Sequence, residues 1–192
     1  MKDETLDLSI VSEIGTGFAC TKMKDKEELE MTTIALLRID DRLVHGQVVT
    51  KWLQESGAKK IVIVDDVLAT NAYLSKVYKM AAPQGIDVDT YSAADFVQQV
   101  QSDTFGEVPL LVLLKSVESL KKIFDHGFFT SKVQIGGVGA SAGKKLVYHT
   151  IAMNLEEAKV LQGLSEKGVE IYFQRVPDDR LQTLEAIVQK NF

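Results

Sequence analysis

One stretch of the chain, residues 38–47, concentrates the side chains whose types and spacing could carry out chemistry. It has the sequence RIDDRLVHGQ and so contains two arginines, two aspartates and one histidine. We expect Asp40 or Asp41 to bond a ring nitrogen of His45 and so expose the other nitrogen as a nucleophile. Histidine with arginine suits phosphoryl transfer, which depends on positioning and charge neutralisation. The alternative, a surface ion pair between Asp40 and Arg42 beside an ordinary turn histidine, stays open at this point.

The segments on either side of this stretch must position it. The apolar run Ile34–Leu37 predicts a strand, and apolar residues spaced i, i+1, i+4 and i+5 within residues 48–53 predict a helix. The carboxyl end of a strand in an open α/β sheet is where ligands bind. His45 stands just before the helix, whose unpaired N–H groups and dipole favour an anion. From this turn Arg38 and Arg42 are both expected to reach an anionic group.

Short β-branched runs alternate with helical patterns from residue 34 onward, which predicts a mostly parallel sheet with right-handed crossovers. The predicted strands are Ile34–Arg38, Lys60–Asp65, Ile86–Tyr91, Leu110–Lys115, Lys132–Gly136, Leu146–Met153 and Val169–Arg175. The predicted helices are Gly46–Ser56, Asn71–Ala82, Ser92–Gln101, Ser116–His126, Asn154–Lys167 and Pro177–Asn191. We therefore expect a single three-layer α/β domain, with a mainly parallel sheet of about seven strands and helices on both faces. Because no helix-length gap precedes Leu146–Met153, that strand is expected to break the parallel order.

Residues 1–30 differ from the rest of the chain. Four lysines there face eight acidic residues, and no hydrophobic period is sustained. We expect a poorly ordered N-terminal extension followed by one domain over residues 31–192. Met31 could serve as a natural start, so the extension is not expected to carry the function.

Composition excludes several classes of function. A net charge of −5, a pI near 5.3 and the lack of a basic stripe argue against a nucleic-acid partner. Cys20 is the single cysteine, which excludes an internal disulfide and fits a reducing compartment. The longest apolar run, Pro109–Leu114, is far short of the roughly 20 residues that span a bilayer. With no signal peptide pattern, we expect a cytoplasmic protein.

The stretch from Arg38 to Val48, RIDDRLVHGQV, resembles the phosphorylation-site motif of one family. It is the mannose/fructose/sorbose-type IIB component of the bacterial phosphoenolpyruvate-dependent sugar phosphotransferase system. Shorter similarities follow in the same order, at Trp52 and at residues 63–66, 81–83, 134–137 and 174–177. The resemblance covers residues 33–192, implies the same α/β fold, and leaves residues 1–30 outside.

This resemblance implies a transferase of the sugar transport system. His45 would accept a phosphoryl group from the phosphohistidine of a IIA domain and pass it to a sugar held by the membrane-embedded IIC/IID components. The activity would be that of a protein-N(pi)-phosphohistidine–sugar phosphotransferase, a sugar kinase in effect, although the residues themselves do not show which ring nitrogen is used. Asp40 and Arg42 match positions around the histidine, and Arg42 would neutralise the phosphoryl group.

Further residues would support the same site. Backbone N–H groups at Gly46 and Gln47 would add to the phosphate cradle, together with Arg38, and Asp66 matches a family acid near the site. No cofactor is implied. The protein would be cytoplasmic and peripherally associated with the membrane permease, and the family suggests a homodimer. Which sugar is carried cannot be deduced, because the sugar contacts would lie in the membrane components.

Two alternatives to the carrier function remain. Residues 137–142, GVGASA, follow a predicted strand, and Glu156 and Glu157 lie about twenty residues further on, as in a dinucleotide-binding oxidoreductase. Against this, the segment after Lys144 has the pattern of a strand where that motif requires a helix. The same loop lacks the first glycine and the Ser or Thr of a P-loop. The other alternative is a regulatory homologue that senses sugar flux without transferring phosphate.

The remaining histidines and one helix face have structural interpretations. His126 ends a predicted helix, where a cation suits the dipole, and His149 falls within a predicted strand. Neither has a Cys or His partner at metal-ligand spacing, so we predict no metal site. Tyr73, Val77 and Met80 share a helix face that is expected to belong to the core.

Overall fold

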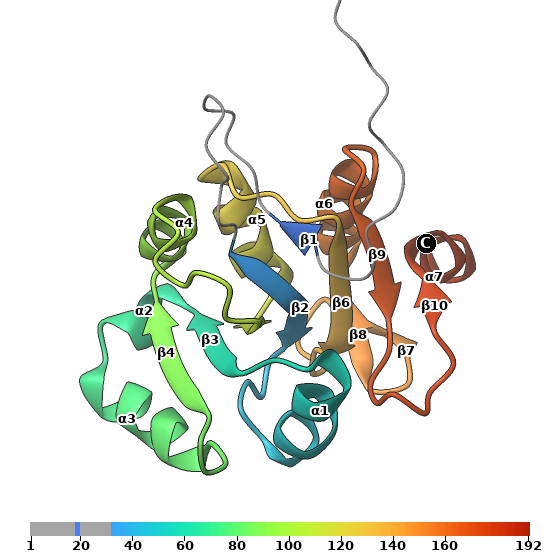
Figure 1. Cartoon of the computed structure of the whole chain (residues 1–192). Coiled ribbons are helices and arrows are strands. Elements are labelled where there is room, and N and C mark those ends of the chain that lie inside the picture. Colours follow the sequence, from blue (N-terminus) through green and yellow to red (C-terminus); the bar gives the residue numbers. More distant parts are fainter. Residues whose placement is uncertain (1–17, 20–31) are drawn as a thin grey trace, which may run out of the picture.

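The computed structural model describes residues 18–19 and 32–192. Its main sheet has the strand order β10-β9-β6-β2-β5-β3-β4 (Figure 1). These strands are β2 (Thr33–Asp40), β3 (Lys60–Val64), β4 (Asp87–Tyr91), β5 (Leu110–Leu114), β6 (Lys132–Gly137), β9 (Glu170–Phe173) and β10 (Gln182–Thr183). All pair in parallel except β10, which runs antiparallel to β9. The predicted fold class is confirmed.

Helices cover both faces of this sheet. One face carries η1 (Val48–Trp52), α1 (Leu53–Ser56), α2 (Asp66–Ala69) and α3 (Ala72–Ala81). The other face carries α4 (Ala93–Gln101), α5 (Val117–Asp125), α6 (Leu155–Ser165) and α7 (Leu184–Asn191). Figure 1 shows α1 and α3 on the side of the domain opposite to α4, α5 and α6. Within residues 18–19 and 32–192, no helix is long and apolar enough to cross a membrane.

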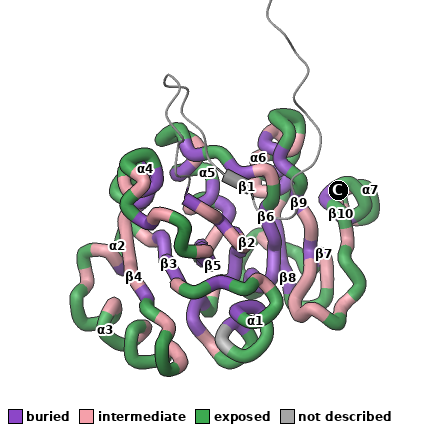
Figure 2. Tube along the Cα trace, viewed as in Figure 1, coloured by how far each residue is buried: buried purple, intermediate pink, exposed green. Residues whose placement is uncertain are grey.

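The uninterrupted apolar runs are the central strands of this three-layer arrangement. Every residue of β5 is buried, and successive side chains alternate between the two cores, with Leu111 and Leu113 on the α1 side. Ile61 and Ile63 of β3 lie beside them in register and face the same way. Figure 2 shows these strands buried in the middle of the domain. Burial on both faces explains why these strands lack an apolar–polar alternation.

The segment 146–153 was wrongly expected to be one strand. It forms a hairpin of β7 (Lys145–Tyr148) and β8 (Ile151–Met153), a separate two-stranded antiparallel sheet. His149, at the hairpin tip, is exposed and has a φ of +46°, so the expectation of a strand histidine is also wrong. Tight hairpins are usually predicted from Gly or Asn at the turn, and this turn contains neither residue.

The last predicted helix is shorter than expected. It begins at Leu184, not at Pro177, after a turn and strand β10. Thr183 caps it through a hydrogen bond from the Ala186 N–H, while Asp179 is engaged by Arg175 and starts no helix. Other predicted starts are confirmed, such as that of α6, where the Asn154 side chain forms a reciprocal capping box.

The expectation for residues 1–30 concerns residues outside the described ones, apart from Phe18 and Ala19. These two form β1, which pairs antiparallel with Thr33 and Ile34 of β2.

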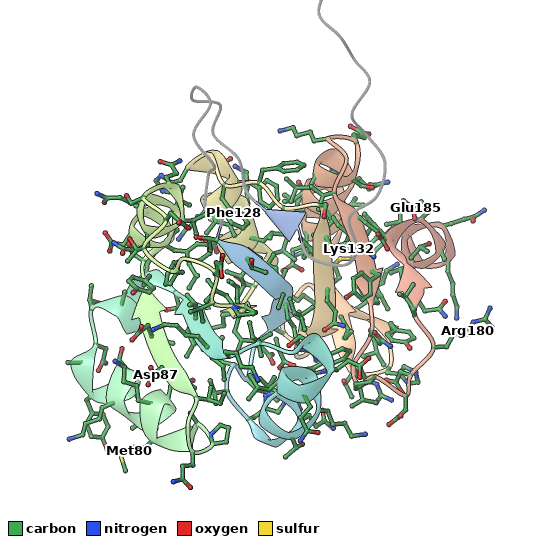
Figure 3. All side chains as sticks on the ribbon, in the orientation of Figure 1. Met80, Asp87, Phe128, Lys132, Arg180 and Glu185 are labelled. Carbon is green, nitrogen blue, oxygen red and sulfur yellow. The ribbon has the colours of Figure 1, made fainter. Side chains whose placement is uncertain are left out.

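The helix face that was expected to join the core does not. Tyr73, Val77 and Met80 of α3 are 75%, 44% and 77% exposed, so this expectation is wrong. Figure 3 shows Met80 pointing away from the domain. The helix instead turns Ser75 and Tyr78 toward the protein.

Candidate active site

The predicted stretch forms a tight turn between β2 and a helix that begins at Gly46. The Leu43 N–H donates to the Asp40 carbonyl oxygen at 2.9 Å and closes the turn. Leu43 has a φ of +54°, a conformation that costs a branched residue roughly 1–2 kcal/mol. Its side chain is wholly buried, and this anchoring holds the strained backbone in place. The turn therefore brings His45 back toward Asp40.

Asp40 is the centre of the site. Its carboxylate has no exposed surface and accepts hydrogen bonds from two guanidinium groups. Arg38 Nη2 lies 2.9 Å from one oxygen, while Arg42 donates from Nε at 3.0 Å and from Nη2 at 3.1 Å. A buried carboxylate needs this compensation, and the two-pronged contact also fixes the orientation of Arg42.

His45 is held by the backbone of its own turn. Its Nδ1 lies 2.8 Å from the Leu43 carbonyl oxygen, and its Nε2 lies 3.8 Å from Asp40 Oδ2. Because a carbonyl can only accept, Nδ1 carries a proton in this geometry. Nε2 is enclosed and has no hydrogen-bond partner among the described residues. In this geometry the Leu43 carbonyl, and not an aspartate, bonds Nδ1, while Asp40 lies beside Nε2, so the expected bond between an aspartate and the ring stays a prediction.

The two arginines have different environments. The Arg42 side chain is 49% exposed beside His45 and can meet an incoming anion. Arg38 is wholly buried and donates to the Asp40 carboxylate, so it does not face an incoming anion directly, and its predicted supporting role at the phosphate stays a prediction. Its guanidinium lies 4.8 Å from the Trp52 ring centre and donates to the side chain of Gln134.

Arg38 instead positions Asp40. Its Nη1 and Nη2 also donate to the carbonyl oxygens of Gln174 and Arg175, both at 3.0 Å. Burial lowers the pKa of Arg38 below its ordinary value, and the adjacent Asp40 carboxylate counteracts this shift. An arginine remains cationic under such conditions, so the buried ion pair persists.

Three glycines make room for these side chains. A Cβ on Gly136 would lie 1.8 Å from Arg38 Cζ, and one on Gly137 would lie 2.8 Å from Asp40 Oδ1. The Gly139 N–H donates to Asp41 Oδ2 at 2.6 Å, which ties the loop after β6 to the turn. These glycines were not predicted as site residues from the sequence. The clustering of glycines in the sequence could have indicated a close approach of the backbone to other groups. It shows which groups are approached only once β6 is known to lie next to β2.

The glycine loop does not have the geometry of a dinucleotide site. It leads into strand β7, whereas the dinucleotide motif requires a helix directly after the glycines. The contacts of Gly136 and Gly137 with Arg38 and Asp40 account for the glycines without a nucleotide.

Asp66 lies at the same edge of the sheet but has its own partners. Its oxygens accept from the Ala93 N–H at 2.9 Å and from Lys122 Nζ at 3.0 Å. The Ala93 hydrogen bond, followed by that from Lys122, lowers the pKa of Asp66. Asp66 and Asp41 both line a cleft of about 470 Å³, and no hydrogen bond joins Asp66 to His45 in the described structure. Its predicted role at the phosphate stays a prediction.

The helix after the turn completes the site. Gly46 and Gln47 are exposed at its first turn, where backbone N–H groups lack partners within the helix. The helix then widens into the π-helical segment η1, a feature frequent at functional sites. Trp52 Nε1 donates to the Arg175 carbonyl at 3.0 Å and links this helix to the β9–β10 loop.

The fold and site define an α/β domain with a histidine and an exposed arginine at the carboxyl edge of its sheet. The chain belongs to the family of the PTS system sorbose subfamily IIB component, whose model matches residues 34–192. The predicted family is confirmed.

Individual relatives agree with this assignment. The fructose-specific EIIB component of Bacillus subtilis is 24% identical, over 78% of this chain and 91% of that protein. The crystal structure of manxB from Thermoanaerobacter tengcongensis superimposes with a TM-score of 0.77 at 33% identity, covering 83% of this chain and 96% of that one. An N-acetylgalactosamine-specific IIB component from Escherichia coli gives a TM-score of 0.73 at 26% identity, covering 78% and 98%. The chain spans about half the length of the mannose-specific EIIAB components that it also matches.

Proposed function

We propose that this chain is a phosphocarrier in which His45 receives a phosphoryl group from a IIA phosphohistidine and passes it to a sugar held by IIC/IID components. The observation that carries the proposal is the grouping of His45 with the half-exposed Arg42 around the buried Asp40. A histidine nucleophile beside a fixed, solvent-facing guanidinium has the composition that phosphoryl transfer requires.

The transfer step follows from this arrangement. A lone pair on the His45 ring attacks phosphorus as the donor N–P bond breaks, and the electron pair of that bond returns to the donor imidazole. Arg42 neutralises the phosphoryl oxygens, and the free N–H groups at Gly46 and Gln47 add hydrogen bonds. Asp40 contributes by holding Arg42 in place.

The attacking nitrogen is proposed to be Nδ1, the N(pi) position. Nε2 is enclosed against Asp40 and out of reach of a donor in this conformation. Attack through Nδ1 requires that the contact with the Leu43 carbonyl opens and that the ring proton moves to Nε2, where it faces the Asp40 carboxylate. The product then has the phosphoryl group on Nδ1 and the proton on Nε2, and the donor ring, which carries a proton on its other nitrogen, leaves as a neutral imidazole.

The sugar is selected elsewhere in this proposal. Relatives with the same domain are named for mannose, fructose, sorbose and N-acetylgalactosamine. This variety fits a carrier domain whose sugar contacts lie in the membrane components. The homodimer suggested by the resemblance stays a prediction.

Labelling with histidine variants tests the proposal. The chain has three histidines, so His126→Ala and His149→Ala are natural controls for His45→Ala. With phosphoenolpyruvate, the general phosphotransfer proteins and a IIA partner, we expect an acid-labile, base-stable label on the wild type and both controls. His45→Ala should remain unlabelled, and full labelling of that variant would refute the proposal. Discharge of the label to sugar by permease membranes separates a carrier from a regulatory homologue.

A further inference from the structure

Helix α3 presents its apolar side chains to solvent. Tyr73, Val77 and Met80, spaced i, i+4 and i+7, form a single stripe, and none of the residues of α3 is buried. The opposite side faces the protein, where Ser75 Oγ donates to the Leu68 carbonyl at 3.1 Å and Tyr78 packs against the core. Because a soluble helix normally turns its apolar side inward, this outward stripe needs a partner.

The charge of the same helix indicates what kind of partner this is. Between Ala72 and Ala81 the only charged residues are Lys76 and Lys79, although the whole chain carries −5. Lys79 is paired with Asp89 at 3.1 Å, whereas exposed Lys76 makes no ion pair with the described residues. The surface is therefore apolar, with one uncompensated positive charge at Lys76.

From these features we infer that α3 lies on the anionic headgroups of a lipid bilayer. A helix with an apolar stripe and lysines beside it binds in the interface of an anionic leaflet, and each lysine near that surface adds attraction. Two other occupants fit less well. A second copy of α3, paired about a twofold axis, would bring Lys76 close to its own copy. Cytoplasmic loops of membrane proteins are rich in Lys and Arg, which would repel the same lysines.

Helix α3 lies on the same side of the domain as the turn that carries His45. The helix packs on the sheet face that also carries η1 and α1, and Leu43 and Val44 of the His45 turn belong to the same apolar cluster as Tyr78. Helix α3 and the His45 turn therefore lie on the same face of the sheet. The inference goes beyond the carrier role, since lipid binding requires no phosphoryl transfer.

Vesicle co-sedimentation of the full chain tests the inference. We expect binding to vesicles of phosphatidylglycerol and phosphatidylcholine, weaker binding at high salt, and none to phosphatidylcholine alone. Lys76→Gln should lower the affinity about fivefold, the contribution of roughly one lysine near an anionic leaflet. Tyr73→Ser combined with Met80→Gln should abolish binding. The controls are Lys190→Gln in α7 and Leu181→Ser in the loop before β10, both exposed positions, which should bind as the wild type does.

Three results would overturn the inference. One is a lack of binding to anionic vesicles, and another is equal binding by the α3 variants and the wild type. The third is a dimer in sedimentation velocity that the Tyr73 and Met80 substitutions dissociate. Labelling of His45 in the same variants is a separate measurement, so loss of lipid binding with normal labelling leaves the phosphocarrier proposal intact.

Discussion

The Nε2 atom of His45 lies 3.8 Å from Oδ2 of Asp40, a carboxylate with no exposed surface. The same carboxylate is bonded to buried Arg38 and to half-exposed Arg42. The arginine that would meet the phosphoryl group is thus fixed by a buried carboxylate, and that carboxylate also lies beside the ring that would take the group. Substitutions at this group should affect both the stability of the domain and the rate of transfer.

Arg42→Ala should slow phosphorylation of His45 by about a hundredfold, because the variant loses a preoriented donor to the transferring group. The fold should be intact, since this side chain is half exposed. Rapid-quench measurement of transfer from phosphorylated IIA gives the rate. Arg180→Ala, at an exposed arginine, is the control and should match the wild type. An Arg42→Ala rate within twofold of the wild type would remove Arg42 from the site.

Asp40→Asn should lower the free energy of unfolding by about 3 kcal/mol, because it leaves the buried Arg38 without its counter-charge. It should also slow transfer, since Arg42 loses its anchor. Urea denaturation measures the stability. Asp87→Asn, at an exposed aspartate, should change stability by no more than about 0.5 kcal/mol. Equal stability of the two variants would contradict the buried ion-pair network.

Gly136→Ala should destabilise the domain by about 3 kcal/mol, because the new Cβ would overlap the Arg38 guanidinium. The matched control is Gly163→Ala in α6, where no atom lies within 4 Å of the new Cβ. That control should be neutral or stabilising by up to about 1 kcal/mol. Thermal unfolding measures the stability of both variants. A Gly136→Ala variant as stable as the wild type would show that the Arg38 guanidinium does not lie against Gly136.

Asp41→Ala should release the loop after β6, because the Gly139 N–H loses its acceptor. Hydrogen exchange in residues 138–143 should be faster than in the wild type, while exchange in β3 and β5 should be unchanged. Unaltered protection of the loop would indicate that the Asp41 contact does not hold it.

The lowered pKa of Asp66 predicts a pH dependence of stability. A carboxyl group with a depressed folded-state pKa stabilises the fold above its unfolded-state pKa of about 3.9, and this stabilisation is lost as the pH falls through the folded-state pKa. The unfolding free energy of the wild type should therefore drop more steeply below about pH 4 than that of Asp66→Asn. Parallel curves for the two proteins in acid denaturation would argue against the bonds to Ala93 and Lys122.

Local signals in the sequence were enough to predict the layers of the fold and the centre of the site. The apolar runs of β3 and β5 identified strands covered on both sides, and the spacing from Val48 to Leu53 identified the helix after His45. Asp40, Arg42 and His45 lie within six residues, so a single turn can bring them together.

The remaining features depend on contacts between distant segments or on unusual backbone conformations. The burial of Arg38 requires Gln134 on β6, 96 residues away, and the Gln174 carbonyl after β9, 136 residues away. Leu43 and His149 both have left-handed backbone conformations, which are usually predicted from glycine or asparagine, and neither position has one of these residues. The apolar residues of α3 have the same helical spacing that a core-facing stripe would have. Only the packing of the helix in the structure shows that they face solvent.

Mapping the phosphorylated residue tests the central claim most directly. The chain would be labelled through phosphoenolpyruvate, the general phosphotransfer proteins and IIA, digested at alkaline pH and sequenced by tandem mass spectrometry. We predict one phosphoryl group, on His45, and NMR of the intact labelled protein should place it on Nδ1. A phosphoryl group on His126 or His149, or no phosphorylation in the presence of active IIA, would contradict the account.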